Sequence, residues 1–360
     1  MLGTTSGRSA FAAGACLVLA VVLFAAGCSA DPATTTSQTA PAETSSTETT
    51  PPSGGTTTVP SLPGDEGLTL DQVRNAACVV EFEGGILSFT LVDGSYQSGE
   101  GGGDPSQADR VKVTMADAVA FGDLNGDRVG DAAIAIRVSV GDSNAGGNGQ
   151  GNGQGGSQGG DDDQDPGNKG ATTYVIALVS EGGEPVHAGY HLLGIGARVD
   201  GLAIADGKIA VDATVPGPED QNGNPKVAVT ATLRLPPGGG GVLLHTGQTS
   251  ETPAGDVREI TVTSPAPGAA VSGAFTIEGR VTIAPFENNL VYHAYDGQMT
   301  ERAVGPVMVD APDLGAPGTF SVVLDLASTG YTGPLFVTLS DLSAADGSIL
   351  ALASVELTLE

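Results

Sequence analysis

Oxygen-bearing side chains recur at close, regular spacing in one glycine-containing segment. Asp123, Asn125, Asp127 and Asp131 occupy positions 1, 3, 5 and 9 of a short loop. Calcium binds about six to eight oxygen atoms at roughly 2.3–2.6 Å, and alternate residues of a tight loop can turn their oxygens inward. The carbonyl of Val129 would supply position 7. The spacing predicts a calcium site with a structural role, because no nucleophile or general base lies nearby in the sequence.

This segment resembles the calcium loops of FG-GAP repeats and of EF-hands. An EF-hand loop needs glycine at position 6 and glutamate at position 12, where this chain has Arg128 and Ile134. Strand-like residues at 119–121 and 132–136 favour a loop between two β-strands instead. Arg128 is expected to need a positive φ, which costs a non-glycine residue about 1 kcal/mol. The alternative interpretation is a turn that hydrogen-bonds its own backbone and binds no metal.

The N-terminus has the organisation of a secretory signal that ends at a cysteine. Arg8 precedes an apolar run, 11–26, and small residues lead into Cys28. The run is shorter than the roughly 20 residues that a membrane-spanning helix needs. The sequence before Cys28 resembles the bacterial lipobox, although Ala25 stands where that family prefers leucine. We therefore expect residues 1–27 to be a lipoprotein signal peptide and Cys28 to carry the lipid.

Two stretches are too polar to build a core. Residues 28–66 are almost entirely Ser, Thr, Pro, Ala, Gly and Glu, which predicts a disordered tether. Residues 141–170 are rich in Gly, Asn and Asp, which predicts a disordered insertion between two strands. A tether belongs between an anchor and a folded region, and two or more acyl chains hold a protein stably on a bilayer. The expected location is the extracytoplasmic face of a cell membrane, lipid-anchored.

The net charge limits the possible binding partners, and the cysteine count limits the possible disulfides. The chain has 42 acidic and 14 basic residues, a formal net charge of −28. Such a surface is repelled by phosphate backbones, which excludes nucleic acid as a partner. Cys16 leaves with the signal and Cys28 takes the lipid, so Cys78 has no partner for an internal disulfide. Its apolar neighbours predict a small buried side chain rather than a reactive thiol.

Other candidate site residues carry weaker signals. His187 and His191 are four residues apart, which on a strand separates them by about 13 Å, too far to share a metal ion. Tyr292, His293 and Tyr295 could form a recognition patch, but ordinary packing within a sheet is the favoured interpretation. No set of residues typical of nucleophilic catalysis is visible in the sequence, although such sets assemble in space.

The overall pattern predicts a mainly β protein with two β domains. The first spans 67–247 and begins with a short helix at 70–77, capped by Thr69 or Asp71. A polar segment, 248–257, is the expected linker. The first domain has strand candidates at 86–92, 111–115, 118–121, 132–140, 173–179, 187–193, 199–205, 208–215 and 226–235.

The second domain, 258–360, alternates apolar and polar residues clearly. Seven short strands separated by turn signals are typical of a two-sheet sandwich. The expected strands are 259–263, 275–283, 290–295, 303–310, 319–326, 335–342 and 350–359.

This domain resembles a named family. Residues 260–268, 271–273 and 275–279 resemble the start of the immunoglobulin-like domain of bacterial spore germination proteins, the type found beside GerMN domains, and 318–321 and 332–335 fit the same pattern. The resemblance implies an Ig-like β-sandwich, an extracytoplasmic setting and no catalytic residues. No GerMN domain precedes it, so a role in germination does not carry over.

The expected function is that of a lipid-anchored binding or structural protein of the bacterial cell envelope, without enzymatic activity. Its partners would be the membrane, through the lipid on Cys28, and an envelope protein or polymer. The alternative is an envelope hydrolase acting on wall polymers, with its site within 67–247. The absence of tryptophan and an aromatic content of 4% favour the binding protein. A calcium-responsive adhesion or assembly factor is a third hypothesis.

Overall fold

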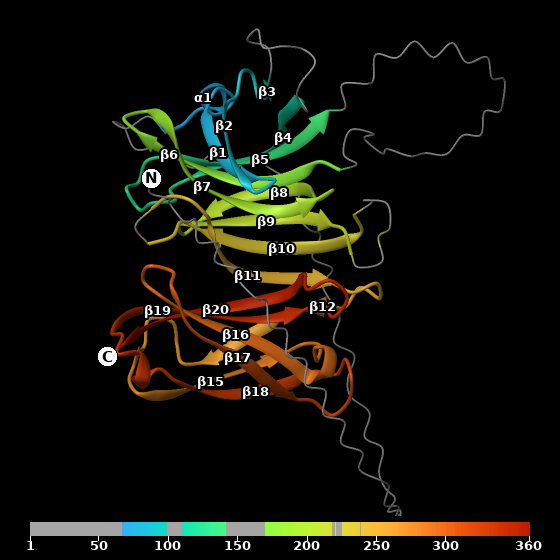
Figure 1. Ribbon diagram of the computed structural model, residues 1–360, viewed down its shortest axis with the longest axis vertical. Coiled ribbons are helices and arrows are strands. Elements are labelled where there is room, and N and C mark those ends of the chain that lie inside the picture. Colours follow the sequence, from blue (N-terminus) through green and yellow to red (C-terminus); the bar gives the residue numbers. More distant parts are fainter. Residues whose placement is uncertain (1–66, 99–109, 142–169, 218–219, 221–224, 238) are drawn as a thin grey trace, which may run out of the picture. The chain divides into compact units, whose positions relative to one another are not determined.

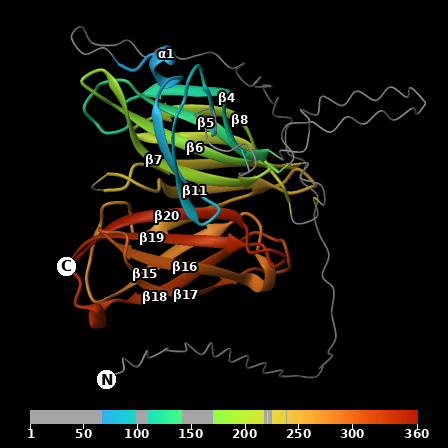
Figure 2. The same ribbon diagram turned by 45° about the horizontal axis from the view of Figure 1, so that its top comes forward.

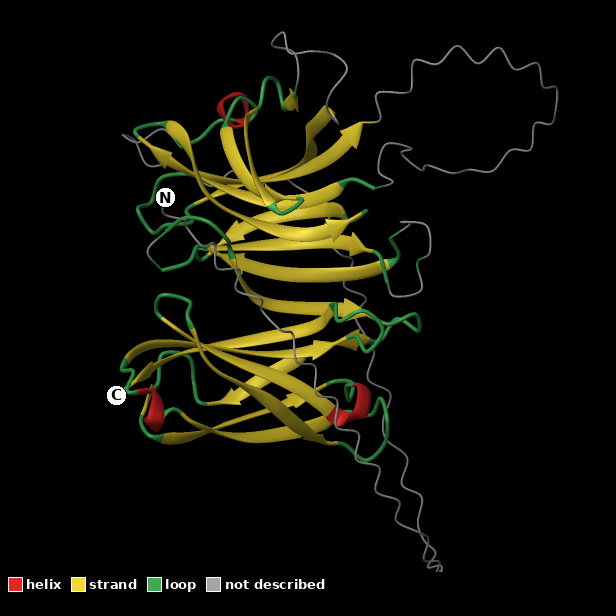
Figure 3. Ribbon diagram, in the orientation of Figure 1, coloured by secondary structure: helices red, strands yellow, loops and turns green. Residues whose placement is uncertain are grey.

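The computed structural model describes residues 67–98, 110–141, 170–217, 220, 225–237 and 239–360 (Figure 1). The expected signal peptide, the tether and all but the ends of the expected insertion lie outside the described residues. Strands make up most of the described chain, and its helical turns are short (Figure 3). The expectation of a mainly β fold is therefore confirmed.

The described chain begins with one turn of helix, α1 (Leu70–Val73). Thr69 caps it, and the side chains of Thr69 and Gln72 form a capping box. The helix is shorter than the expected span of 70–77. Its end is explained by Asn75, whose side chain donates a hydrogen bond to the carbonyl of Asp71 at 2.8 Å. That carbonyl is the acceptor that a continuing helix would use.

A two-stranded hairpin lies across one face of a five-stranded antiparallel sheet (Figures 1 and 2). The hairpin consists of β1 (Ala77–Phe82) and β2 (Gly85–Thr90). The sheet has the order β3-β4-β5-β6-β7. Its strands are β3 (Ser95–Gln97), β4 (Arg110–Gly122), β5 (Asp131–Gly141), β6 (Thr172–Glu181) and β7 (Glu184–Ile195).

The central strands are apolar on both faces. Successive side chains of a strand point to opposite sides of its sheet. On β5, Ile134 and Ile136 pack beneath the hairpin, in the same cluster as Cys78. Ala133 and Ala135 face the other way and contact a second sheet. This explains why the segment 132–140 reads as a nearly continuous apolar run rather than as a strict alternation.

The second layer of this region has the pairing order β8-β9-β10-β11, and its sheet continues through β11 into the strands of the C-terminal region. Asp206 and Gly207 both have positive φ, 52° and 69°, which is the geometry of a tight two-residue hairpin turn between β8 and β9. The strands are β8 (Arg198–Ala205), β9 (Lys208–Val215), β10 (Val227–Arg234) and β11 (Leu244–Glu251).

The expected linker at 248–257 is wrong in its first part, because β11 extends into it. Residues 248–251 belong to this strand, which pairs with β10 on one side and, at Gly247 and Gln248, with β20 (Ile349–Leu359) on the other. A further short strand, β12 (Val257–Arg258), also pairs with β11. The polar side chains of this segment suggested a linker. A strand, however, requires only that backbone N–H and C=O groups are paired, and those of this segment are paired on both sides.

The C-terminal region is a β-sandwich with one core. All seven expected strands are present. They form two layers, β13-β15-β18 and β17-β16-β19-β20, which the pairing of β17 with β18 joins at one edge, and β20 continues into β11. Buried side chains such as Ile277, Leu290 and Leu339 fill the space between the sheets. Its strands are β13 (Ile260–Ser264), β14 (Ala270–Val271), β15 (Ala274–Val281), β16 (Asn289–Asp296), β17 (Glu301–Asp310), β18 (Gly318–Asp325), β19 (Gly333–Leu342) and β20 (Ile349–Leu359).

Candidate functional site

Asp123 organises the loop between β4 and β5. Its carboxylate accepts hydrogen bonds from the backbone N–H groups of Gly126 at 2.6 Å and Arg128 at 2.9 Å. Arg128 has a φ of 71°, as expected from the sequence, and Gly126 has a φ of 86°. The loop thus contains two residues in the left-handed region, and the bonds to Asp123 help to hold them there.

Asn125 and Asp127 hold the tip of the same loop. Asp127 Oδ1 accepts a hydrogen bond from the N–H of Val129 at 2.7 Å, and Asn125 Nδ2 donates to Asp127 Oδ2 at 2.9 Å. The N–H of Asp127 donates to Asn125 Oδ1 at 2.9 Å. These are the bonds of a turn that caps its own backbone.

Asp131 is the buried member of the loop, with 0% of its surface exposed. Its carboxylate accepts hydrogen bonds from the N–H groups of Leu124 at 2.8 Å and of Ser180, in β6, at 2.9 Å. Burial raises the pKa of this carboxyl, the two backbone hydrogen bonds lower it, and the charges of Asp127 and Asp123 raise it. Asp131 therefore ties the loop to the central sheet.

The hydrogen bonds of this loop are those expected for a turn that caps its own backbone and binds no metal. Among the residues that the structure describes, no three His, Cys, Asp or Glu side chains are placed to hold a metal ion together. The carboxylates would have to turn from their backbone partners toward a common centre. Burial is the main cause of the raised pKa of Asp131, and repulsion from Asp127 and Asp123 adds to it; a cation would relieve that repulsion. Calcium binding at this loop stays a prediction.

The described chain starts beside this loop. The N–H of Leu68 donates to the carbonyl of Gly130 at 2.8 Å. A Cβ on Gly67 would lie 2.8 Å from the Cα of Gly130, closer than a side-chain carbon can approach. Glycine at position 67 therefore lets the chain lie against the end of the loop.

The expected lipid site, Cys28, lies outside the described residues. Within the described ranges, no helix has the length and apolar character that crossing a membrane would require. Cys78, on β1, is buried between the hairpin and the central sheet, and loss of hydration raises the pKa of its thiol to about 12. The thiol is therefore protonated and shielded at neutral pH, as expected for a core side chain.

His187 and His191 each contact an aromatic ring that their spacing in the sequence did not predict. The ring of His187 stacks on Tyr190 with the centroids 6.4 Å apart, whereas His191 meets His245 of β11 edge-on at 4.9 Å. Desolvation, with a smaller effect of His245, lowers the pKa of His191 to about 3. Desolvation likewise lowers the pKa of His245 to about 4. Both imidazoles are neutral at neutral pH, and only the fold reveals the pair.

The residues considered as a recognition patch in the sandwich do not act as one surface. Tyr292 packs against the core, and its ring fills the space beside Gly305. His293 and Tyr295 stack on each other at 5.9 Å, and His293 Nδ1 lies 2.7 Å from the carboxylate of Glu301. The first contact joins neighbours on one face of β16, and the second joins β16 to β17, as in the ordinary packing of a sheet.

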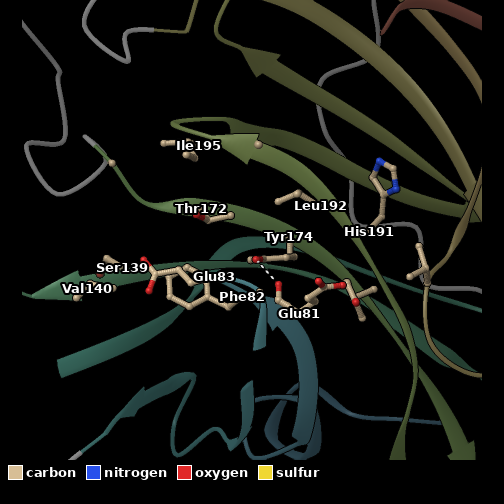
Figure 4. Close-up of a pocket in the computed structure, with 15 residues that line it drawn as sticks. Glu81, Phe82, Glu83, Ser139, Val140, Thr172, Tyr174, His191, Leu192 and Ile195 are labelled. Atoms are coloured by element: carbon tan, nitrogen blue, oxygen red, sulfur yellow. Dashed lines mark hydrogen bonds between the residues drawn. The ribbon is translucent and has the colours of Figure 1, made fainter. Parts of the chain in front are cut away.

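A cavity of about 860 Å³ opens where the turn of the β1–β2 hairpin meets the central sheet (Figure 4). In Figure 4, Glu81 and Glu83 of the hairpin face Leu192 and Ile195 of β7 across the opening. Tyr174 lies between them, and its hydroxyl donates to the carbonyl of Glu81 at 2.7 Å. The other lining residues are Phe82, Gly84, Ser139, Val140, Gly170, Thr172, Tyr190, His191, Gly194 and Val242.

The cavity walls are mainly apolar, and part of that surface is open to solvent. Leu192, Ile195 and Val242 are 52%, 64% and 56% exposed. Tyr174 and Tyr190 meet edge-to-face at 6.1 Å and form an aromatic wall. Exposed apolar side chains grouped around a concavity are typical of a binding site. No sequence pattern pointed to it, because its walls come from segments far apart in the chain.

Two carboxylates and two aromatic rings bring polar atoms to this cavity. Glu81, near the end of β1, and Glu83, in the turn that follows, are exposed carboxylates. Burial raises the pKa of Tyr174 to about 12, and its hydroxyl is already bonded to a carbonyl. Among the described residues His191 contacts His245 and has no hydrogen bond to a hydroxyl. The arrangement can bind an apolar ligand with polar ends, but it does not pair a nucleophile with a base.

None of the curated proteins matches the chain significantly. Residues 259–348 match the family model described as the immunoglobulin-like domain of bacterial spore germination, a span that contains β13 to β19. This match confirms the resemblance inferred from the sequence and indicates a structural or binding role. The C-terminal region of this chain is thus similar to the immunoglobulin-like domain of bacterial spore germination.

Proposed function

We propose that this chain is a lipid-anchored binding protein of the bacterial cell envelope, held on the extracytoplasmic face of a membrane through Cys28. The observation that carries the binding role is the open apolar cavity of the first region, with Leu192, Ile195 and Val242 exposed around it. The Ig-like region supports the same role, since such domains serve as structural or binding modules. The signal-like N-terminus and the lipobox-like residues before Cys28 support the anchor.

The partner in this proposal is an envelope protein or polymer rather than nucleic acid. The net charge of −28 disfavours any polyanion. The alternative, a hydrolase of wall polymers, would need a carboxylate pair on either side of the bond that is cleaved. Glu81 and Glu83 are the carboxylates in the cavity, so Glu81→Gln and Glu83→Gln test that alternative directly. Loss of wall hydrolysis by the purified protein in either variant would favour the enzyme.

The anchor is tested by metabolic labelling with a fatty-acid probe in cells that produce the wild type or Cys28→Ser. We expect label on the wild type only, and release of Cys28→Ser from the membrane fraction or retention of its signal peptide. Cys78→Ser is the matched control, because that thiol is buried, and it should be labelled like the wild type. Equal labelling of the wild type and Cys28→Ser would contradict the anchor.

A further inference from the structure

The cavity lies at a sheet edge that is only partly covered. β7 is the last strand of the central sheet. At Tyr190 this edge is in use: its N–H donates to the carbonyl of Gly241 at 2.9 Å, and its carbonyl accepts from the N–H of Leu243 at 2.8 Å. Backbone groups alternate in direction along an antiparallel strand, so those of Leu192 point to the same side. In the described part of the chain no strand pairs with β7 beyond Tyr190 on that side.

The apolar walls follow this free edge. Leu192 and Ile195 lie on the last residues of β7, and Val242 lies on the segment that pairs with Tyr190. A polypeptide strand placed along the edge would direct alternate side chains toward the cavity. Backbone hydrogen bonds then supply affinity and the cavity supplies selectivity, as in other cases of strand addition.

The charge of the rim selects among peptides. Glu81 and Glu83 are the charged side chains among the lining residues, and both are exposed. A lysine or arginine near the apolar residues of the peptide would complement them. The chain's own segment at 142–169 is a poor occupant, because it contains no Val, Leu, Ile or aromatic residue and carries several aspartates.

We propose that the cavity binds an extended segment of another protein, added as a strand to the free edge of β7 at Leu192. Apolar side chains at alternate positions of that segment occupy the cavity, and an adjacent lysine or arginine lies beside Glu81 and Glu83. This inference rests on the proposed binding function and names the chemistry of its partner.

Fluorescence anisotropy with the full chain in phosphatidylcholine nanodiscs tests it, with empty nanodiscs as the blank. The probe is a fluorescein-labelled ten-residue peptide with valine at alternate positions, threonine between them and two lysines at its end. We expect it to bind at least tenfold more tightly than the same peptide ending in two glutamates. N-methylation of the backbone nitrogens on one edge of the peptide should weaken binding at least tenfold, because those donors face β7.

Variants at exposed positions connect this binding to the cavity. Leu192→Ser combined with Ile195→Ser should weaken binding about tenfold, whereas Val323→Ser, at a 62% exposed position on β18, should not change it. Glu81→Gln combined with Glu83→Gln should weaken binding about 3- to 10-fold at low salt and less at high salt. Glu278→Gln, an exposed carboxylate on β15, is the matched control.

Several outcomes would overturn the inference: no binding of the lysine peptide, equal binding of the N-methylated peptide, or no effect of the Leu192 and Ile195 substitutions. Binding of a dansylated fatty acid that depends on Leu192 and Ile195, without peptide binding, would assign the cavity to lipid and also overturn it. None of these results would affect the labelling of Cys28, so failure of this inference is distinguishable from failure of the anchor.

Discussion

The two β regions bury their strands in different ways. In the Ig-like region one core lies between two sheets, and the strands alternate between buried and exposed side chains, as β15 does from Ala274 to Val281. In the first region the central sheet is covered on both faces, by the β1–β2 hairpin and by the sheet that contains β8 to β11. The hairpin covers only part of its face, and the cavity opens at its turn.

The two regions also differ in the polar and apolar features that they present. The Ig-like region matches a known domain family, and its buried Asp296 accepts hydrogen bonds from two backbone N–H groups and from Arg302. The first region holds the cavity, the His191–His245 pair and the Asp-rich loop. The first region thus holds the features on which the proposed binding function rests.

The comparison predicts that each region has its own stability. Ile136→Ala, in the core beneath the hairpin, and Leu339→Ala, in the sandwich core, each delete a fully buried side chain. Each should cost about 2–5 kcal/mol and lower only the thermal transition of its own region in calorimetry. Val323→Ala, at an exposed position, should change stability by less than about 0.5 kcal/mol. A single transition that both core variants lower would show that the regions unfold together.

Acid should weaken the first region selectively. The pKa values of His191 and His245 are lowered to about 3 and about 4, so the unfolded chain binds more protons than the folded one below the ordinary value of about 6.5. Stability is therefore full above about pH 6.5 and falls as pH decreases. At pH 4.5 the loss is about 2–3 kcal/mol per histidine.

The measurement is urea unfolding of the wild type and of His191→Phe with His245→Phe between pH 7.5 and 4.5. As pH falls, the free energy of unfolding of the wild type should decrease relative to that of the variant. The raised pKa of Asp131 acts in the opposite direction, and taking the difference removes it. A difference that does not change with pH would contradict the role of the pair.

Asp131→Ala should destabilise the first region by about 1–3 kcal/mol, because it leaves the buried N–H groups of Leu124 and Ser180 without their acceptor. Asp131→Asn should cost less, since the amide oxygen can still accept one of these bonds. Asp296→Ala is the counterpart in the sandwich and should lower the other transition. Chemical denaturation resolves these effects, and an unchanged midpoint for Asp131→Ala would contradict them.

Calcium should have the smallest effect and should act on the first region alone. A loop of three carboxylates and one amide, of which only the Asp131 carboxylate is buried, predicts an affinity of roughly 10⁻⁴–10⁻³ M. Millimolar calcium should then raise the melting temperature of this region by a few degrees at most. Magnesium should do little, since it gives up its waters reluctantly. Asp127→Ala should abolish the rise; identical melting of both proteins in calcium and in chelator would leave the loop as a turn only.

Strands with a clear local pattern of apolar and polar residues were predicted well. Strands that depend on pairing with distant segments were predicted poorly. The seven sandwich strands and the positive φ of Arg128 follow from alternation and from turn composition. The strand β1 was missed because Ala77–Phe82 is short and lies in an apolar stretch without a clear period. β11 was missed because its residues are polar, whereas pairing with β10 and β20 depends on backbone groups that every residue carries.

The candidate site shows the same limit. The oxygen spacing of the loop was visible, but which acceptors its carboxylates would find was not, because Ser180 lies in a different strand. His245 and the cavity residues are brought to β7 by pairing at Tyr190 and by the hairpin, contacts between segments distant in sequence. A sequence lists candidate ligands, and only the fold decides which of them meet.

The contact between Gly67 and Gly130 has a mechanical consequence for an anchored protein. If Cys28 is fixed in a membrane, a pull along the chain reaches the described residues at Gly67, which lies against the end of the Asp-rich loop, with Leu68 hydrogen-bonded to Gly130. The load passes first to the turn between β4 and β5 and, through Asp131, to β6. Substitution of Gly67 by a larger residue would loosen this attachment while leaving the cavity and the sandwich intact. In a force spectrometer, pulling from the N-terminus would then extend the chain at lower force.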